Sequence, residues 1–167
     1  LESAIKTLNH RGPDCQLIEQ PDDNIGVAHA RLSIIDTSEA ANQPMSAYDN
    51  RYTIVFNGEI YNYQSLKSQL EKDKQEVFKT LSDTEVILRM FHHYGEDCVN
   101  SFNGFFAFAI YDKEKKETFI ARDRMGIKPL LYTQTEEHFL FASEMKALLA
   151  FKIAKEIDFV SLQQYFQ

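Results

Sequence analysis

The spacing of apolar residues predicts a chain that changes repeatedly between helix and strand. Apolar residues within 1–8 recur at the interval of one helix face. Two short β-rich runs, over 16–20 and 25–32, predict strands that are separated by a Pro-Asp-Asp-Asn turn. Residues 36–49 show neither period and contain Asn-Gln-Pro, so they predict a loop.

The next stretch carries the first candidate chemistry. Residues 53–56 are uncharged β-formers and predict a buried strand, and Asn57-Gly58, a turn dipeptide, follows at once. A turn here would place the Asn57 amide beside the bare Gly58 N–H. Donors of these two kinds hold an oxyanion when a rigid element fixes them. The structural alternative is a plain Asn-Gly hairpin turn.

Two helices are predicted after this strand. The apolar spacing over 63–70 predicts a short one. Ser82-Asp83-Thr84-Glu85 fits a capping box and starts the second, which Gly95 ends. The buried face expected for this second helix is Val86, Ile87, Met90, Phe91 and Tyr94.

The second half of the chain predicts paired strands. Residues 105–111 pair with 117–121 across a charged turn, and 130–133 pair with 138–142. The run 105–111 is apolar at every position, so both of its faces need cover. The pattern therefore predicts an α+β fold of two stacked antiparallel sheets with outer helices.

Two shorter helices are expected near the end of the chain. Ser143 is predicted to cap a helix that carries Met145, Leu148 and Leu149. A last amphipathic segment begins at about residue 158, with Leu162 and other apolar residues on one face.

Composition narrows the function classes. The chain has 167 residues, 44% hydrophobic and 26% charged, which fits one globular domain with a sizeable core. A net charge of −7 without a dense Lys/Arg run argues against nucleic acid and anionic membranes as partners. Neither a transmembrane run nor a convincing metal-ligand cluster is present. Only two cysteines, far apart, indicate a reducing cytoplasm.

Three separated polar groups complement a free amino acid. Arg31 near a strand end could grip a carboxylate through two hydrogen bonds, although a salt bridge with Asp36 would explain it equally well. Asp83 could hold an ammonium, although its charge also suits a helix N-terminus. Asn57 and Gly58 could bind a side-chain carbonyl. Together with Arg31 and Asp83, they would complement glutamine or asparagine as a ligand.

Many motifs, in order along the chain, resemble the glutaminase domain of glutamine-hydrolysing asparagine synthetases, a branch of the class II glutamine amidotransferases. Glu59-Ile60-Tyr61-Asn62 after Asn57-Gly58 points to this branch in particular. The motifs that carry the resemblance are Arg11-Gly12-Pro13-Asp14, residues 29–36, Gln43-Pro44-Met45, residues 56–63, Ser82-Asp83-Thr84-Glu85, residues 102–112, residues 121–130 and residues 141–148.

The resemblance implies a fold and a mechanism. The fold is a four-layer αββα sandwich of the N-terminal nucleophile hydrolase type. In that family an N-terminal cysteine attacks the glutamine amide, with its own α-amino group as base, and a thioester forms and is hydrolysed.

The resemblance also assigns roles to residues of this chain. Asn57 and Gly58 would form the oxyanion hole, and Arg31 would bind the α-carboxylate. Asp83 with Glu59 would hold the α-ammonium. The floor of the pocket would be Leu32, Ser33, Ile34 and Ile35.

The nucleophile itself is expected ahead of Leu1. Family members carry it in a Cys-Gly-Ile type strand before the first helix. Cys15 follows the Arg-Gly-Pro-Asp loop at a position that the family does not reserve for cysteine, and Cys98 follows the second predicted helix. We therefore expect this stretch to bind glutamine without hydrolysing it.

The resemblance divides the chain and names its partners. Residues 1–150 match the glutaminase domain, which needs no cofactor, and 151–167 begin the connection to a synthetase domain that uses ATP and magnesium. The expected function is to supply ammonia for asparagine synthesis from aspartate. The same domain could instead serve an enzyme that amidates a sugar acid or a peptide, or it could be a non-catalytic glutamine-binding module. A homodimer is a further possible assembly that the sequence does not decide.

Overall fold

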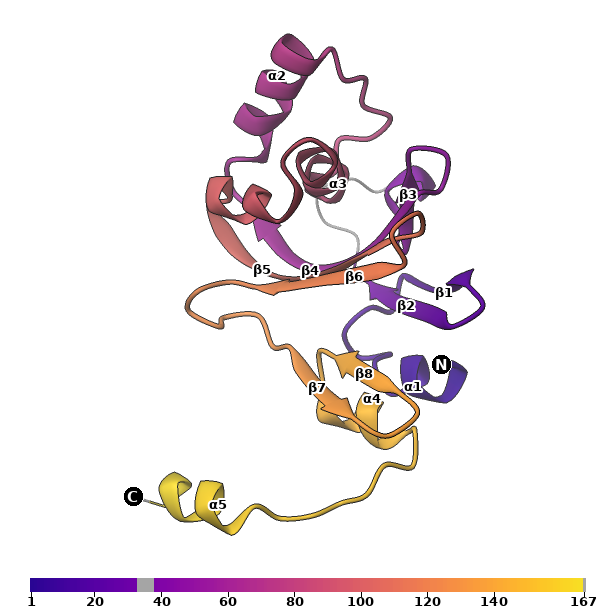
Figure 1. The fold of residues 1–167 in the computed structure, drawn as a ribbon, viewed down its shortest axis with the longest axis vertical. Coiled ribbons are helices and arrows are strands. Elements are labelled where there is room, and N and C mark those ends of the chain that lie inside the picture. The colour runs from indigo at the N-terminus through magenta and orange to yellow at the C-terminus, as the bar shows by residue number, and fades with distance from the viewer. Residues whose placement is uncertain (33–37, 167) are drawn as a thin grey trace.

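The structure is a computed structural model and describes residues 1–32 and 38–166. At its centre is a four-stranded antiparallel sheet with the order β3-β4-β5-β6 (Figure 1). Its two long strands, β4 and β5, pair without interruption from Tyr52 opposite Asp112 to Ile60 opposite Gly104. The strands are β3 (Met45–Ala47), β4 (Tyr52–Ile60), β5 (Gly104–Asp112) and β6 (Glu117–Arg122).

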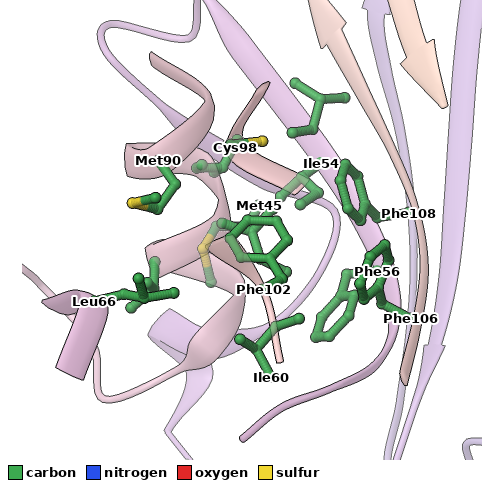
Figure 2. Close-up of a cluster of buried hydrophobic side chains, with 14 of the residues drawn as sticks. Met45, Ile54, Phe56, Ile60, Leu66, Met90, Cys98, Phe102, Phe106 and Phe108 are labelled. Atoms are coloured by element: carbon green, nitrogen blue, oxygen red, sulfur yellow. The ribbon is translucent and has the colours of Figure 1, made fainter. Parts of the chain in front are cut away.

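Helices α2 (Tyr63–Lys74) and α3 (Asp83–Tyr94) cover one face of this sheet, followed by the 3-10 helix η2 (Gly95–Ser101). The main apolar core lies between them. Figure 2 shows Phe56, Phe106 and Phe108 of the sheet directed towards residues of the helical layer, such as Met90 and Cys98. The alternate side chains of β4 and β5 therefore anchor α3 against the sheet.

The opposite face of the sheet is covered by two β-hairpins and two short helices (Figure 1). A cavity of about 170 Å³ remains between the sheet and these elements, lined by Val55 and Ala107 of the sheet, by α1 and by β8. The hairpins are β1 (Cys15–Asp22) with β2 (Ile25–Arg31), and β7 (Leu131–Gln134) with β8 (Phe139–Ala142). The helices are α1 (Glu2–Lys6) and α4 (Met145–Leu149).

The resulting order is helices, sheet, hairpins, helices, and it confirms the predicted α+β sandwich. The second β layer consists of two separate hairpins rather than one continuous sheet. The last helix, α5 (Phe159–Tyr165), lies away from the sandwich and keeps its aromatic side chains exposed. Within the described part of the chain, no helix has the length and apolarity needed to cross a membrane.

Several local predictions were wrong about short elements, a helix cap and the burial of single side chains. The expected loop 36–49 contains a 3-10 turn, η1 (Glu39–Ala41), and the short strand β3, which is too short to show a period. Glu144 rather than Ser143 is the N-cap of α4, and no side chain caps that helix. On α3, Leu88 is fully buried, whereas Tyr94, expected inside, is 37% exposed.

The predicted Asn57-Gly58 turn is also wrong, because β4 continues through both residues to Ile60. Pairing with β5 along this whole length overrides the local turn preference. Glycine is needed at position 58 for a different reason. A Cβ there would lie 2.3 Å from the Phe105 carbonyl oxygen and 2.8 Å from the Phe106 Cα. The strands can approach as they do only because residue 58 has no side chain.

We therefore expect Gly58→Ala to lower the free energy of unfolding by about 3 kcal/mol, since backbone atoms would have to move. Gly95→Ala is the matched control, because its Cβ would meet open space and only the positive φ of 57° would cost about 1 kcal/mol. Urea denaturation of both variants measures this difference. Equal losses would show that the close contact of β4 with β5 is unimportant.

Candidate functional site

Most of the polar residues singled out from the sequence line one cavity of about 610 Å³. Its walls are the end of β2, the middle of β4, the N-terminus of α3 and the segment around Lys128. The predicted site residues on this cavity are Arg31, Leu32, Asn57, Gly58, Glu59 and Asp83. Ser33, Ile34 and Ile35 lie outside the described residues. The size suits a free amino acid with its side chain.

Arg31 is the last residue of β2 and is almost entirely buried. Its Nη1 donates to the Ser38 carbonyl at 3.1 Å and to Asn42 Oδ1 at 2.6 Å. These two acceptors fix the plane of the guanidinium in the cavity wall, where a carboxylate could be bound. The proposed alternative partner, Asp36, lies outside the described residues.

Asp83 is the first residue of α3, and only 5% of its surface is exposed. Its Oδ2 accepts the Ile60 N–H at 3.1 Å. Burial raises the pKa of this carboxyl, the nearby charge of Glu59 adds to the rise, and the N–H groups of Ile60 and Thr84 partly offset it. A cation bound beside Asp83 would stabilise its ionised form.

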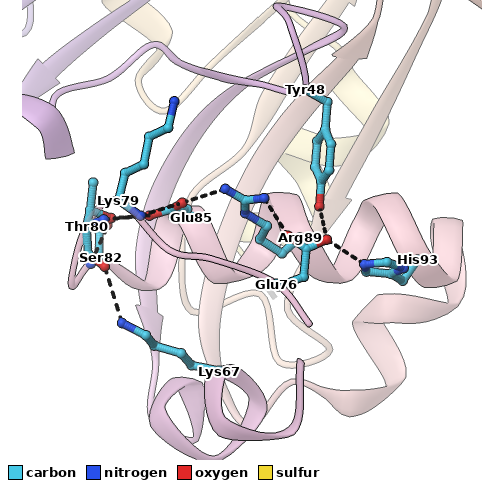
Figure 3. Close-up of polar contacts among 9 residues, drawn as sticks. All are labelled: Tyr48, Lys67, Glu76, Lys79, Thr80, Ser82, Glu85, Arg89 and His93. Carbon is cyan, nitrogen blue, oxygen red and sulfur yellow. Dashed lines mark hydrogen bonds and ion pairs between the residues drawn. The ribbon is translucent and has the colours of Figure 1, made fainter. Parts of the chain in front are cut away.

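The turn before α3 is held by a polar cluster shown in Figure 3. The Ser82 hydroxyl accepts the Thr84 N–H, as predicted for an N-cap. Glu85 does not complete the capping box. It accepts the N–H groups of Lys79 and Thr80, at 3.1 and 2.8 Å, and is paired with Arg89 at 2.9 Å. This cluster fixes the backbone that leads into Asp83.

Burial would raise the pKa of Glu85, but hydrogen bonds from Lys79, Arg89 and Thr80 outweigh it and lower the pKa overall. Glu85 is therefore ionised at neutral pH, although it lies among buried residues. Its charge is offset by Arg89, which also pairs with Glu76.

Backbone donors of β4 face the cavity beyond the point where β3 ends. The N–H of Phe56 is bound by Gln43 Oε1 at 2.6 Å, and the N–H of Ile60 by Asp83. Because alternate residues of a strand direct their N–H groups to the same side, Gly58 presents its N–H on this same edge. Asn57, which precedes it, also lines the cavity.

Sequence reasoning did not assign a role to His29 or Gln43, although both line the cavity. His29 Nε2 donates to the Phe56 carbonyl at 3.0 Å, and burial lowers its pKa to about 4. The imidazole is therefore neutral at pH 7, and its buried Nδ1 has no hydrogen-bond partner among the described residues. The period of two that puts His29 on the same strand face as Arg31 was a usable signal.

Further charged side chains line the cavity. Arg11 and Lys146 both contact Glu144, and Arg11 and Glu144 line the cavity. Hydrogen bonds from Arg11, Lys146 and His10 lower the pKa of Glu144 to about 2. Lys128, whose Nζ lies 4.7 Å from the Phe105 ring centre, lines the cavity from the segment after β6.

The two cysteines lie elsewhere. Cys98 is buried in the apolar core under α3, and burial raises the pKa of its thiol to about 12. Cys15 pairs with Arg31 across the β1–β2 hairpin but is not among the residues that line the cavity. Neither thiol is placed to attack a ligand held there.

The family model of the glutamine amidotransferase domain matches residues 1–167. The chain belongs to the glutamine amidotransferase domain family. It is 45% identical over 168 residues to the glutamine-hydrolyzing asparagine synthetase 1 of Bacillus subtilis, covering 98% of this chain and 26% of that protein. It is 38% identical to the amidase chry2 of Gibberella zeae, covering 93% of this chain and 23% of that protein.

A solved structure supports the same assignment. The glutamine phosphoribosylpyrophosphate amidotransferase of B. subtilis, complexed with ADP and GMP, matches with a TM-score of 0.63 and 27% identity, over 74% of this chain and 28% of that one. This likeness confirms the fold of the N-terminal nucleophile hydrolase type. The chain spans about a quarter of the length of the curated relatives that it matches.

The buried neutral His29 of this amidotransferase domain should make stability depend on pH. Its pKa is about 4 when folded and 6.5 in its ordinary state, so the unfolded chain binds more protons between these values. The free energy of unfolding should therefore rise by up to about 3 kcal/mol from pH 4 to pH 6.5 through this residue. His29→Gln, which keeps a donor for the Phe56 carbonyl, should remove this part of the rise.

The measurement is urea denaturation at pH 4.5 and 7, with His138→Gln as control because His138 is exposed in the β7–β8 turn. A His29→Gln variant with an unchanged pH dependence would contradict a buried, neutral imidazole.

Proposed function

We propose that this amidotransferase domain binds L-glutamine in the 610 Å³ cavity as the first half of an ammonia-supplying reaction. The observation that supports this proposal is the convergence of Arg31, Asp83 and the Asn57-Gly58 backbone on that single cavity. A basic, an acidic and a neutral donor group complement the carboxylate, ammonium and side-chain carbonyl of one amino acid. The matching family is named for glutamine amidotransfer.

Each group receives one role in the proposal. Arg31 binds the α-carboxylate, and Asp83, with Glu59 nearby, binds the α-ammonium. The Gly58 N–H and the Asn57 amide donate hydrogen bonds to the side-chain carbonyl oxygen of glutamine and stabilise the negative charge that develops on this oxygen during the reaction. Leu32, 55% exposed, lies at the edge of the cavity, and Ser33, Ile34 and Ile35 would complete its floor.

Hydrolysis needs a nucleophile from outside residues 1–167, because neither Cys15 nor Cys98 reaches the cavity. In the proposed reaction, an N-terminal cysteine thiol of the whole protein attacks the glutamine side-chain carbon. Its proton passes through the α-amino group to the departing ammonia, a thioester remains, and water then releases glutamate. Without that cysteine, residues 1–167 bind glutamine but release no ammonia.

The ammonia is proposed to serve a synthetase domain, which uses ATP and magnesium to make asparagine from aspartate, in the whole protein. The 45% identity to a glutamine-hydrolyzing asparagine synthetase supports this choice. In this scheme residues 1–150 are the glutaminase domain and 151–167 the connection, consistent with the separation of α5 from the sandwich. The two cysteines, both free, fit a cytoplasmic protein.

A second candidate is the same domain in an enzyme that amidates another acid, such as a sugar acid or a peptide. The 38% identity to a fungal amidase favours keeping this candidate. The residues of the cavity are the same in both schemes, so they specify the ammonia donor and not the acceptor.

Isothermal titration calorimetry tests the binding proposal directly. We expect L-glutamine to bind and to be preferred over D-glutamine and L-glutamate, with no ammonia release by residues 1–167. The absence of any preference among the three ligands would contradict the assignment.

Arg31→Ala should weaken L-glutamine binding by roughly 30- to 150-fold, because a charge-assisted pair of hydrogen bonds to the carboxylate is lost. Arg124→Ala is the matched control, since Arg124 is exposed and lies outside the cavity, and it should change affinity less than twofold. Similar losses in both variants would show only a general effect of net charge.

Asp83→Asn should separate binding from stability. The buried carboxylate has a raised pKa, so its ionisation at pH 7 opposes folding, while asparagine can still accept the Ile60 N–H. We expect roughly 10- to 100-fold weaker glutamine binding with an equal or higher unfolding temperature at pH 7. A variant that lost stability and kept its affinity would contradict the role of Asp83.

A further inference from the structure

Gln43 lies in the wall of the cavity and has no role in the scheme above. It belongs to the segment that the sequence predicted as loop, between η1 and β3, and only 7% of its surface is exposed. A buried side-chain amide needs partners for both of its ends, so its contacts show what it is there to hold.

Both ends of the Gln43 amide are bonded to the protein. Its Oε1 accepts the Phe56 N–H at 2.6 Å, and its Nε2 donates to Thr84 Oγ1 at 3.2 Å. Phe56 directly precedes Asn57-Gly58 on β4, and Thr84 directly follows Asp83 on α3. The Gln43 side chain therefore joins β4, which carries the hydrogen-bond donors proposed for the ligand's side-chain carbonyl, to the N-terminus of α3, which carries the Asp83 carboxylate.

The bond to Phe56 replaces a missing strand partner. β3 pairs with β4 only from Tyr52 to Ile54, and Phe56 is the next residue whose N–H points to that side. The Gln43 oxygen occupies this position, and His29 binds the Phe56 carbonyl. Without Gln43, the Phe56 N–H would be buried without this partner, and β4 would be free to shift next to Gly58.

We propose that Gln43 is a positioning residue that sets the distance between the Asn57-Gly58 donors and Asp83, and so selects ligands with a side-chain carbonyl at the distance found in glutamine. This inference rests on the proposed function. Gln43 itself acts through Phe56 and Thr84 and need not touch the ligand.

The test compares two ligands in calorimetry, L-glutamine and L-norvaline, which shares the α-carboxylate and α-ammonium but has no carbonyl on its side chain. Gln43→Met keeps the length of the side chain and removes both hydrogen bonds. It should weaken L-glutamine binding by roughly 3- to 10-fold, the value of one or two hydrogen bonds, and change L-norvaline binding less than twofold. Amide exchange of the Phe56 N–H, followed by NMR, should become faster.

Two further variants keep the result interpretable. Thr84→Val removes only the second bond and should lower the glutamine-to-norvaline preference by about twofold to threefold. Gln64→Met, on the exposed surface of α2, should leave the preference unchanged. If Gln43→Met does not fold, Thr84→Val carries the test, and an unchanged preference in that variant overturns the inference.

The outcomes distinguish this inference from the function on which it rests. A wild-type chain without a preference for glutamine over norvaline would overturn both. A wild-type preference that survives in Gln43→Met, or an equal loss of both ligands, would overturn the role of Gln43 alone.

Discussion

The structure depends on which groups bind the backbone N–H and carbonyl groups along the edge of β4 beyond the end of β3. A buried strand edge needs a partner for each N–H and carbonyl, and β3 provides one only as far as Ile54. From there, side chains take over. Gln43 and His29 bind the backbone of Phe56, and Asp83 binds the N–H of Ile60. Because side chains replace a strand here, the edge opens into a cavity.

This arrangement places a functional group next to each structural bond. Asp83 is both the partner of Ile60 and the only one of the proposed site's carboxylates that is buried. Burial raises its pKa, which makes it an unfavourable anion in the empty site and a favourable one beside an ammonium. Arg31 is oriented by Ser38 and Asn42 in the same way. The site is therefore organised before a ligand arrives, which lowers the entropy cost of binding.

The sequence correctly predicted the elements that have a strong local signal. Residues 105–111 are apolar at every position, which indicated a strand that is buried on both faces. Ser82 indicated the start of α3. Both signals come from residues next to one another in the sequence. Asn57-Gly58 misled for the opposite reason, since pairing with β5 over nine residues outweighed a two-residue turn preference. The close approach that excludes a Cβ at Gly58 is a long-range contact that no local pattern shows.

The candidate site was predictable in its charged members but not in its supports. Arg31, Asp83 and Asn57 carry chemistry that stands out from apolar neighbours. Gln43 and His29 do not stand out, because their importance comes from contacts 13 and 27 residues away along the chain. Their bonds to Phe56 became visible only when the strands and the helix had been placed together.

A crystal structure of the chain with bound L-glutamine tests the central claim most directly. The account predicts the α-carboxylate at the guanidinium of Arg31, the α-ammonium at Asp83, and the side-chain carbonyl oxygen within hydrogen-bond distance of the Gly58 N–H. Glutamine bound in the reverse direction, or in the smaller apolar cavity between the sheet and the two hairpins, would contradict it.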